Sequence, residues 1–207
     1  MEVIRRDDII VTRFANPFKG SNSFLIQSMD SNGGWLFDIG DSTEIAIATY
    51  KLKIDGLFIT HAHFDHIKGI RQFCSSHPEC RVYGSSQCIQ WLSDDRRNLS
   101  LYYGNPLCFV PEKSQVVCEE NFFRLTDSAF IEFISTPGHT VDSMTYKIGD
   151  ILITGDSYIP YVRPVTKLRG GDKQKYEESL AIIKSRMTDQ TLLLPGHGPI
   201  FVGSELL

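Results

Sequence analysis

The sequence predicts an α/β protein in which layers of β-sheet are covered by helices on their outer faces. Short apolar runs that end in turn residues recur along the whole chain, and segments with helical periodicity separate several of them. Strands and helices also fall into two similar halves, with neither an exact repeat nor a linker between them. We therefore expect residues 1–207 to form one domain, with a cleft between its two halves.

The first half opens with an antiparallel meander. Its strands are expected at residues 3–4, 9–14, 23–27 and 35–37, and the last two join through a hairpin across residues 31–34, which read Ser-Asn-Gly-Gly. Ser42 is a suitable N-cap for a helix that runs to about residue 50. The remaining expected elements are a buried strand at 56–60, a helix at 67–74, a strand at 81–83 and a helix at 87–92.

The second half is richer in strands. A polar and aromatic stretch at residues 94–106 comes first, and its Tyr102 and Tyr103 are candidates for the wall of a cleft. Strands are then expected at residues 115–118, 122–125, 129–135, 143–148, 151–154 and 191–194, with one long helix at 173–187 before the last of them.

Composition narrows the class of protein. The 207 residues are 42% hydrophobic and 22% charged, which is ordinary for a globular domain and excludes disordered and fibrous classes. The net charge of −4 disfavours a nucleic acid as the main partner. No apolar stretch has the length of a signal peptide or a membrane span, and the five cysteines are odd in number without a C-x-x-C pair. We expect a cytoplasmic protein with free thiols and no membrane partner.

Half of the six histidines lie within six residues. His61, His63 and His66 stand with Asp65 in the pattern H-x-H-x-D-H, directly after the expected strand 56–60. In a tight loop that leaves a strand, His61 and His63 can point toward one centre, while Asp65 and His66 serve a neighbouring one. Imidazole and carboxylate ligands suit zinc and iron, and the absence of a nearby cysteine favours an open site with room for water over a closed structural one.

Three further candidate ligands each follow a predicted strand. His139 lies just after residue 135, Asp156 after residue 154 and His197 after residue 194, and a glycine stands beside each of them. The complete candidate set has five histidines and two aspartates: His61, His63, Asp65, His66, His139, Asp156 and His197. His77, which precedes a proline, is expected to be structural.

These motifs resemble those of the metallo-β-lactamase fold superfamily. The elements T-H-A-H-F-D-H, P-G-H-T, G-D-S and P-G-H-G, together with L-F-D-I-G at residues 36–40, are similar to those of the glyoxalase II-like (hydroxyacylglutathione hydrolase-like) enzymes. The resemblance implies a four-layer αβ/βα sandwich of two mixed sheets, with helices on the outer faces and two metals in a cleft at one edge.

The same resemblance implies a role for each candidate. His61, His63 and His139 would hold the first metal, Asp65, His66 and His197 the second, and Asp156 would bridge them. Asp38 would orient a ligand histidine from outside the metal site. The cofactor is then two divalent ions, for which zinc is expected and iron or manganese are alternatives.

The implied reaction is hydrolysis. A hydroxide that bridges two metals would attack a thioester or a related ester, and Asp65 would transfer the proton to the leaving group. Hydrolysis of a lactone or phosphodiester and a mononuclear-iron dioxygenase acting on persulfides remain alternatives, because the family hosts several reactions on related ligand sets. A metal-binding scaffold without activity is a further reading, whereas a flavin-linked di-iron reductase fits less well because His63 stands where that group has glutamate.

The substrate is expected to be a small molecule that carries negative charge. The segment after Asp156 offers two tyrosines and three cations as a clamp for an anion: Tyr158, Tyr161, Arg163, Lys167 and Arg169. Longer glyoxalase II enzymes bind glutathione through a C-terminal helical segment, and only ten residues follow His197. The resemblance therefore implies a short form without that segment, and the sequence leaves both glutathione recognition and a dimeric state open.

Overall fold

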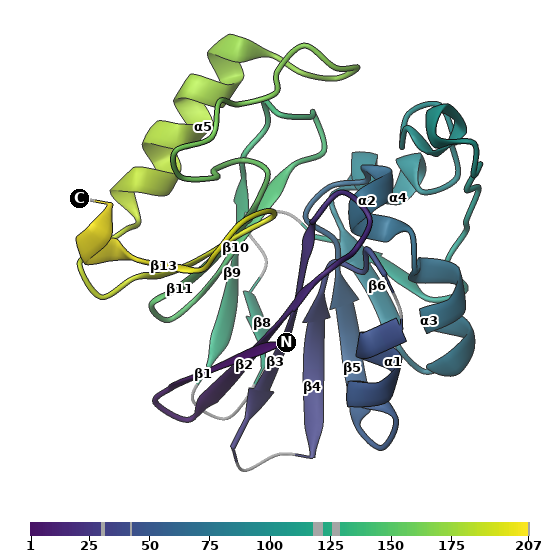
Figure 1. Cartoon of the computed structure of the whole chain (residues 1–207), viewed down its shortest axis with the longest axis horizontal. Helices are drawn as coiled ribbons and strands as arrows, with labels where there is room; N and C mark the ends of the chain where they lie inside the picture. The colour runs from purple at the N-terminus through teal and green to yellow at the C-terminus, as the bar shows by residue number, and fades with distance from the viewer. Residues whose placement is uncertain (30–31, 42, 118–121, 126–128, 207) are drawn as a thin grey trace.

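The structure is a computed structural model that describes residues 1–29, 32–41, 43–117, 122–125 and 129–206. Within these residues, thirteen strands form two mixed sheets (Figure 1). The first sheet has the order β1-β2-β3-β4-β5-β6-β7. Its pairs are antiparallel from β1 to β4 and parallel from β4 to β7. Its strands are β1 (Glu2–Arg6), β2 (Ile9–Ala15), β3 (Asn22–Ser28), β4 (Gly33–Phe37), β5 (Lys53–Phe58), β6 (Arg81–Gly84) and β7 (Ser114–Val116).

The second sheet is built from the rest of the chain. Its order is β13-β12-β11-β10-β9-β8, and only the β11–β12 pair is parallel. The strands are β8 (Phe122–Arg124), β9 (Phe130–Ser135), β10 (Met144–Ile148), β11 (Ile151–Gly155), β12 (Leu192–Pro195) and β13 (Phe201–Val202). The parallel β11–β12 pair is connected through α5 (Lys173–Ser185), as a parallel crossover requires.

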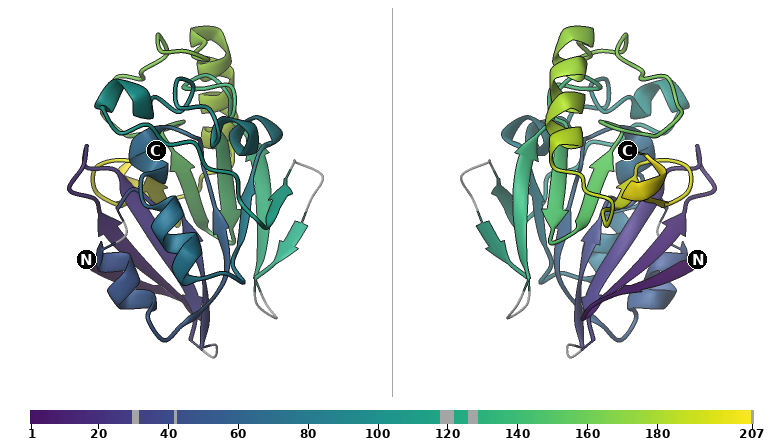
Figure 2. Two further views of the ribbon diagram at one scale, coloured as in Figure 1. Left: turned by 90° about the vertical axis from the view of Figure 1, so that its right-hand side faces the viewer. Right: turned by 90° about the vertical axis from the view of Figure 1, so that its left-hand side faces the viewer.

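Helices cover the outer face of each sheet, so the predicted fold class is confirmed. Figure 2 shows the blue and teal helices in front of the first sheet in one view and α5 in front of the second sheet in the opposite view. The covering helices of the first sheet are α1 (Thr43–Thr49), α2 (Phe64–Ile67), α3 (Ile70–Ser76) and α4 (Ser86–Trp91). Short 3-10 turns occur at η1 (Ser100–Tyr103) and η2 (Gly203–Glu205).

The four layers are helices, first sheet, second sheet and α5, and one buried apolar cluster fills each of the three interfaces between them. The strands of the first sheet send alternate side chains to its two faces, so Leu57 faces the covering helices while Phe58 faces the second sheet. Phe58 stacks on Phe37 and Tyr83 with ring centroids 5.1 and 4.6 Å apart, and the Tyr146 hydroxyl donates to the Ile59 carbonyl at 2.6 Å. This aromatic layer fixes the two sheets against each other.

The structure differs from the sequence prediction where tertiary contacts override local pattern. The helix expected at residues 67–74 is α3, which begins at Ile70, and a separate short helix, α2, precedes it and ends at Ile67. The chain breaks between them because the Gly69 amide donates to the Ile39 carbonyl in the turn after β4 at 2.9 Å. The strand expected at 56–60 runs from Lys53 to Phe58, since Thr60 turns away to bond Asp38. The glycines expected in the hairpin turn begin β4 instead, and β13 and η1 were not predicted.

Some predictions fall where the structure gives no description. The N-cap role of Ser42, the turn residue Ser31 and the strand end at Cys118 lie outside the described residues. Within the described residues, no helix combines the length and the apolar character needed to cross a bilayer. The cytoplasmic location and the single domain stay predictions.

Candidate metal centre

The seven candidate ligands converge from four strand ends at one edge of the sandwich. His61 to His66 follow β5 and enter α2, which lies at the upper end of the first sheet in Figure 1. His139 follows β9, Asp156 follows β11 and His197 follows β12, so the second sheet supplies the other three ligands. A Cβ atom at Gly196 would lie 2.2 Å from the Asp156 Oδ1 atom, so this approach of the two loops requires glycine.

Three buried histidines form the first group. The ligating atoms of His61, His63 and His139 all lie within 4.8 Å of one another. The Nδ1 atom of His63 lies 2.9 Å from Nε2 of His139, and the His61 ring is 4.7 Å from that of His63 and 4.9 Å from that of His139. Three imidazoles at this spacing match the nitrogen-rich ligand sets that zinc takes in catalytic sites.

The second group combines imidazoles with carboxylates. The ligating atoms of Asp65, His66 and His197 lie within 4.8 Å of one another, and the Nε2 atom of His197 is 3.3 Å from Asp65 Oδ2. Asp156 lies between the two groups, because its oxygens are 3.5 Å from His66, 3.6 Å from His139 and 3.5 Å from His197. Its position is that of a carboxylate able to face two cations.

Hydrogen bonds at the Nδ1 atoms set the orientation of the histidine rings in the cluster. The Nδ1 atom of His66 lies 2.8 Å from Asp38, and Nδ1 of His139 lies 2.8 Å from the Val165 carbonyl. Because a carboxylate and a carbonyl only accept, both Nδ1 atoms carry hydrogen and the Nε2 atoms face the cluster. Thr60 donates its hydroxyl to Asp38 at 2.7 Å and so accepts from Nδ1 of His61, 3.1 Å away.

Several polar atoms in the cluster are buried without a hydrogen bond to any described residue. They are Nε2 of His61, Nε2 of His63, Nε2 of His66 and Oδ1 of Asp156. Buried polar atoms in proteins normally have a partner, since leaving one unpaired costs about 1–3 kcal/mol. Four such atoms in one cluster, all of types that bind divalent metals, fit a site for metal ions.

Burial and charge divide the histidines into two classes. Burial lowers the pKa of His61 well below its usual value and that of His63 to about 3, so both rings are neutral. Burial also opposes charge on His66 and His197, but carboxylates outweigh it. The carboxylates of Asp65, Asp156 and Asp38 raise the pKa of His66 well above its usual value, and hydrogen bonds to Asp156 and Asp65 raise that of His197 to about 9.

The pKa values of the two cluster carboxylates, Asp65 and Asp156, are lowered. Burial alone would raise the pKa of Asp65 and Asp156, but the positive charge on His66 and the hydrogen bond from His197 lower both values. Both side chains are therefore carboxylates near neutral pH. Anionic oxygens beside neutral imidazoles are the ligand types that zinc, iron and manganese accept.

Three residues that the sequence analysis missed hold these loops together. The buried Asp142 accepts from the Ala62 amide at 2.7 Å, between the first two motif histidines. Ser21 donates to the Asp65 carbonyl at 2.6 Å, and Asn22 donates to the carbonyls of Pro195 and Gly198 at 2.9 and 3.0 Å. None of the three stands beside a motif histidine in the chain, so sequence spacing gave no signal.

A cavity of about 190 Å³ opens directly beside the cluster. His139, Asp156 and His197 form one side of it, and the segment after Asp156 forms the other with Ile159, Val162, Arg163, Pro164 and Val165. The predicted substrate residue Arg163 therefore lines the cavity beside the cluster. Its apolar neighbours give the cavity a predominantly hydrophobic wall.

The other four predicted substrate residues lie elsewhere. Tyr158 packs against the apolar cluster under α5, and the Tyr161 hydroxyl donates to the Glu205 carbonyl while its ring contacts Phe201, so neither tyrosine lines the cavity. Lys167 and Arg169 line a separate cavity of about 410 Å³ together with Tyr102 and Tyr103. Tyr102 and Tyr103, the expected cleft-wall residues, therefore line one cavity together with cations of the segment after Asp156.

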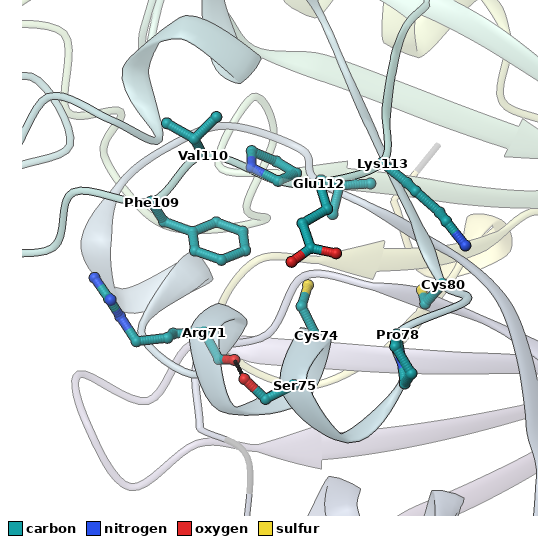
Figure 3. Close-up of a pocket in the computed structure, with 11 residues that line it drawn as sticks. Arg71, Cys74, Ser75, Pro78, Cys80, Phe109, Val110, Glu112 and Lys113 are labelled. Atoms are coloured by element: carbon teal, nitrogen blue, oxygen red, sulfur yellow. Dashed lines mark hydrogen bonds between the residues drawn. The ribbon is translucent and has the colours of Figure 1, made fainter.

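A further cavity of about 390 Å³ lies between α3 and the segment before β7 (Figure 3). The thiols of Cys74 and Cys80 line it, and burial raises their pKa to about 11 and 12. These two cysteines, like the buried Cys88, are free thiols that pack as small apolar side chains.

Comparison with known proteins agrees with this geometry. The family model of the metallo-beta-lactamase superfamily matches residues 16–197. The chain belongs to the metallo-β-lactamase superfamily. Among curated members, the hydroxyacylglutathione hydrolase of Shewanella loihica is 27% identical over 184 residues, which are 87% of this chain and 62% of that enzyme. This superfamily member therefore spans less than two thirds of the length of that relative.

Solved structures of the superfamily have the same fold. The crystal structure of the BLEG-1 B3 metallo-beta-lactamase is 23% identical, with a TM-score of 0.83 over 94% of this chain and 95% of that one. The crystal structure of TTHA1623 in a di-iron-bound form is 22% identical, with a TM-score of 0.78 over 94% and 96% of the two chains. The αβ/βα sandwich predicted from the resemblance is thereby confirmed.

Proposed function

We propose that this superfamily member is a binuclear metallohydrolase that cleaves a thioester or a related ester. The observation that carries the proposal is the convergence of seven donors on one buried cluster with unpartnered ligand atoms. His61, His63 and His139 would hold one divalent ion, Asp65, His66 and His197 the other, and Asp156 would contact both. Zinc is the expected metal, and iron or manganese suits the same donors.

The hydrolysis needs a nucleophile, a polarised acyl group and a proton for the leaving group. When bound, a pair of divalent ions activates water near neutral pH and withdraws electron density from the substrate oxygen. The water oxygen then adds to the acyl carbon, the carbon–sulfur bond breaks, and the sulfur leaves as a thiol after it receives a proton. Asp65 is a partly accessible carboxylate at the cluster, so it can take up a proton and deliver it to that sulfur.

Recognition of the substrate would use the segment after Asp156. The cavity wall of Ile159, Val162 and Val165 suits an apolar acyl group, and Arg163 suits a negative charge near it. The hydrolase reading agrees with the name of the Shewanella loihica relative, a hydroxyacylglutathione hydrolase. The expected partner is thus a small molecule and not a nucleic acid or a membrane.

One experiment tests the proposal directly. The protein is purified without added metal, zinc, iron and manganese are measured per chain, and the same sample is assayed with thioester, lactone, phosphodiester and persulfide substrates. Two ions per chain with thioester turnover support the proposal. Three outcomes contradict the proposal. They are one iron per chain with oxygen uptake on a persulfide, turnover of only a lactone or phosphodiester, and a metal-loaded protein that is inert toward all substrates. The variants His61→Ala and His77→Ala are compared, and only the first should lose metal and turnover.

The role of Asp65 has its own test. Asp65→Asn keeps a ligand oxygen but cannot carry the proton, so thioester turnover should fall about 100-fold, in the range of general acid–base effects. The change should be larger for an ester with a poor leaving group than for one with a good leaving group, because the good one needs less protonation. Metal content is measured on the same variant. Full turnover by metal-loaded Asp65→Asn would rule out the proton-transfer role.

A further inference from the structure

Two walls of the cavity of about 410 Å³ connect to loops of the metal centre. One wall is the loop of Val165, whose carbonyl holds His139, and Lys167 follows two residues later, at most about 7.6 Å away between Cα atoms. The other wall is Tyr103, whose ring lies 6.0 Å from that of Phe64 at an interplanar angle of 22°. Phe64 stands between the candidate ligands His63 and Asp65, so Tyr103 packs on the motif loop, while Val165 and Lys167 line the two cavities from one loop.

The cavity carries an excess of positive charge. Arg96, Lys167 and Arg169 line it, and no acidic residue does. Among the described residues these three cations have no ion-pair partner, whereas the neighbouring Arg97 pairs with Asp94 at 3.3 Å. Three unpaired cations around one hollow, in a chain whose net charge is −4, make a site that attracts an anion. The two guanidinium groups can bind a phosphate through paired hydrogen bonds.

Two aromatic rings stand beside these cations. Tyr102 is 66% exposed, so its ring is accessible to a ligand. Tyr103 is 44% exposed, but its ring stacks on Phe64 and has the Lys19 ammonium 5.0 Å from its centroid, so it supports the wall. Leu99, at the base of the same wall, has a left-handed backbone with φ of 68°. Such conformations are disfavoured for leucine and persist only where surrounding contacts enforce them, often at binding sites.

Buried polar contacts fix this wall before any ligand binds. The side-chain amide of Asn98 donates to the Leu107 carbonyl at 2.9 Å, and its oxygen accepts from the Ser100 amide at 3.0 Å. The Ser100 hydroxyl accepts from the Leu107 amide at 2.8 Å. The tyrosine pair is therefore held in place, which lowers the entropy cost of stacking a flat ring against it.

We propose that this cavity binds a nucleoside phosphate, which is the thiol-side handle of the thioester substrate, while the acyl group lies in the smaller cavity beside His139. This inference rests on the proposed thioester hydrolysis and names its substrate class: thioesters of a nucleotide-bearing thiol such as coenzyme A. Phosphates meet Arg96, Lys167 and Arg169, and the base stacks on the exposed ring of Tyr102. A tripeptide thiol fits less well, because its ammonium group would find no carboxylate in the lining.

The test measures binding of the handle alone. Adenosine 3′,5′-bisphosphate, which has no thioester and cannot be turned over, is titrated into the full-length protein by calorimetry at low ionic strength. We expect saturable binding that weakens with added salt. Arg96→Ala, Lys167→Ala and Arg169→Ala should each weaken it about tenfold, the effect of losing one charge-assisted contact. Lys173→Ala removes an exposed lysine outside the cavity and should leave binding unchanged. All four side chains are exposed, so the variants should fold.

Other outcomes would overturn the site. The nucleotide site is contradicted if the bisphosphate shows no saturable binding up to about 5 mM. Equal affinity for adenosine without phosphates, or unchanged affinity in all three cavity variants, would also contradict it. Turnover assays then separate this inference from the proposed function. Turnover of an acylglutathione without binding of the bisphosphate keeps thioester hydrolysis and overturns the nucleotide site. Bisphosphate binding without hydrolysis of any thioester supports the nucleotide site and contradicts thioester hydrolysis.

Discussion

Asp38 connects the two histidines at the ends of the H-x-H-x-D-H motif. It accepts from the Thr60 amide and hydroxyl at 2.7 Å each, and its Oδ2 atom lies 2.8 Å from Nδ1 of His66. Through the same threonine hydroxyl it also fixes the ring of His61. Its backbone is left-handed, with φ of 57°, a conformation that aspartate tolerates better than most residues. One buried carboxylate thus orients a ligand in each of the two groups.

Asp38→Asn should weaken metal binding by about 10- to 100-fold, the usual effect of losing a carboxylate that orients a ligand histidine. The asparagine amide offers one accepting oxygen where three donors converge, so at least one ring loses its orientation. Competition with a chromogenic zinc chelator measures the affinity, and circular dichroism checks the fold. Asp41→Asn is the matched control, because Asp41 pairs with Lys68 and touches no ligand histidine. Equal zinc affinity in the folded Asp38→Asn variant would contradict the orienting role.

The thiols give a prediction with a defined pH dependence. Burial raises the pKa of Cys74 to about 11 and of Cys80 to about 12, so at pH 8 about one in a thousand Cys74 groups and one in ten thousand Cys80 groups is the reactive thiolate. Cys108 is exposed. Alkylation of native protein with iodoacetamide, followed by peptide mass spectrometry, should modify Cys108 before Cys74 and Cys80, and the Cys74 rate should rise about tenfold per pH unit toward pH 11. Equal rates for Cys80 and Cys108 at pH 8 would contradict this assignment of burial.

The histidines that converge in the cluster could be predicted from the sequence as candidate ligands, but most of the residues that hold them could not. Six residues contain His61, His63 and His66, and a strand end precedes each remaining ligand, so local spacing carries the signal. Asp142 contacts Ala62 across 80 positions, and Asn22 contacts Pro195 across 173. Such contacts depend on how the sheets pack, which local pattern does not encode. The exception is Asp38, which the resemblance of residues 36–40 identified.

At the scale of elements, the central strands were predictable because both of their faces are buried, whereas the edge strands β1, β7 and β8 are largely exposed. Runs such as residues 151–154 are apolar without alternation, as expected for a strand between two packed layers. Element ends were less predictable, since they depend on docking. Gly69 ends α2 by bonding the turn after β4, and the segment around Tyr102 forms η1 because Asn98 and Ser100 bond it from beneath.

Asn98→Ala should destabilise the protein by about 1–3 kcal/mol, because it leaves buried backbone groups without their partner. Urea unfolding monitored by circular dichroism measures the change in the free energy of unfolding. Asn105→Ala is the matched control in the same segment, since the Asn105 side chain is exposed, and its effect should stay within about 0.5 kcal/mol. Similar losses for the two variants would show that the buried amide does not support the η1 wall.

At the scale of the molecule, the candidate metal centre joins the two sheets. His61, His63, Asp65 and His66 follow β5 of the first sheet, whereas His139, Asp156 and His197 follow strands of the second. The aromatic layer between the sheets ends close to the same edge, where Tyr146 bonds the Ile59 carbonyl two residues before His61. Ions bound by ligands from both sheets should therefore stabilise the arrangement of the whole chain and not one loop.

We expect zinc to raise the melting temperature of the whole molecule in one step. A ligand present at 100 times its dissociation constant stabilises the folded state by about 2.7 kcal/mol, which corresponds to about 5–10 °C for a chain of this size. Circular dichroism reports both sheets, and tryptophan fluorescence reports two packed regions, because Trp35 packs on Phe58 between the sheets and Trp91 is buried under the helices of the first sheet. If residues 1–207 fold as one domain, both signals should move together, with and without zinc.

His139→Ala should lose the zinc-induced shift, whereas His77→Ala should keep it because His77 stacks on Phe73 away from the cluster. Two separate transitions, or a zinc-induced shift that survives in His139→Ala, would mean that the histidine cluster does not couple the two sheets.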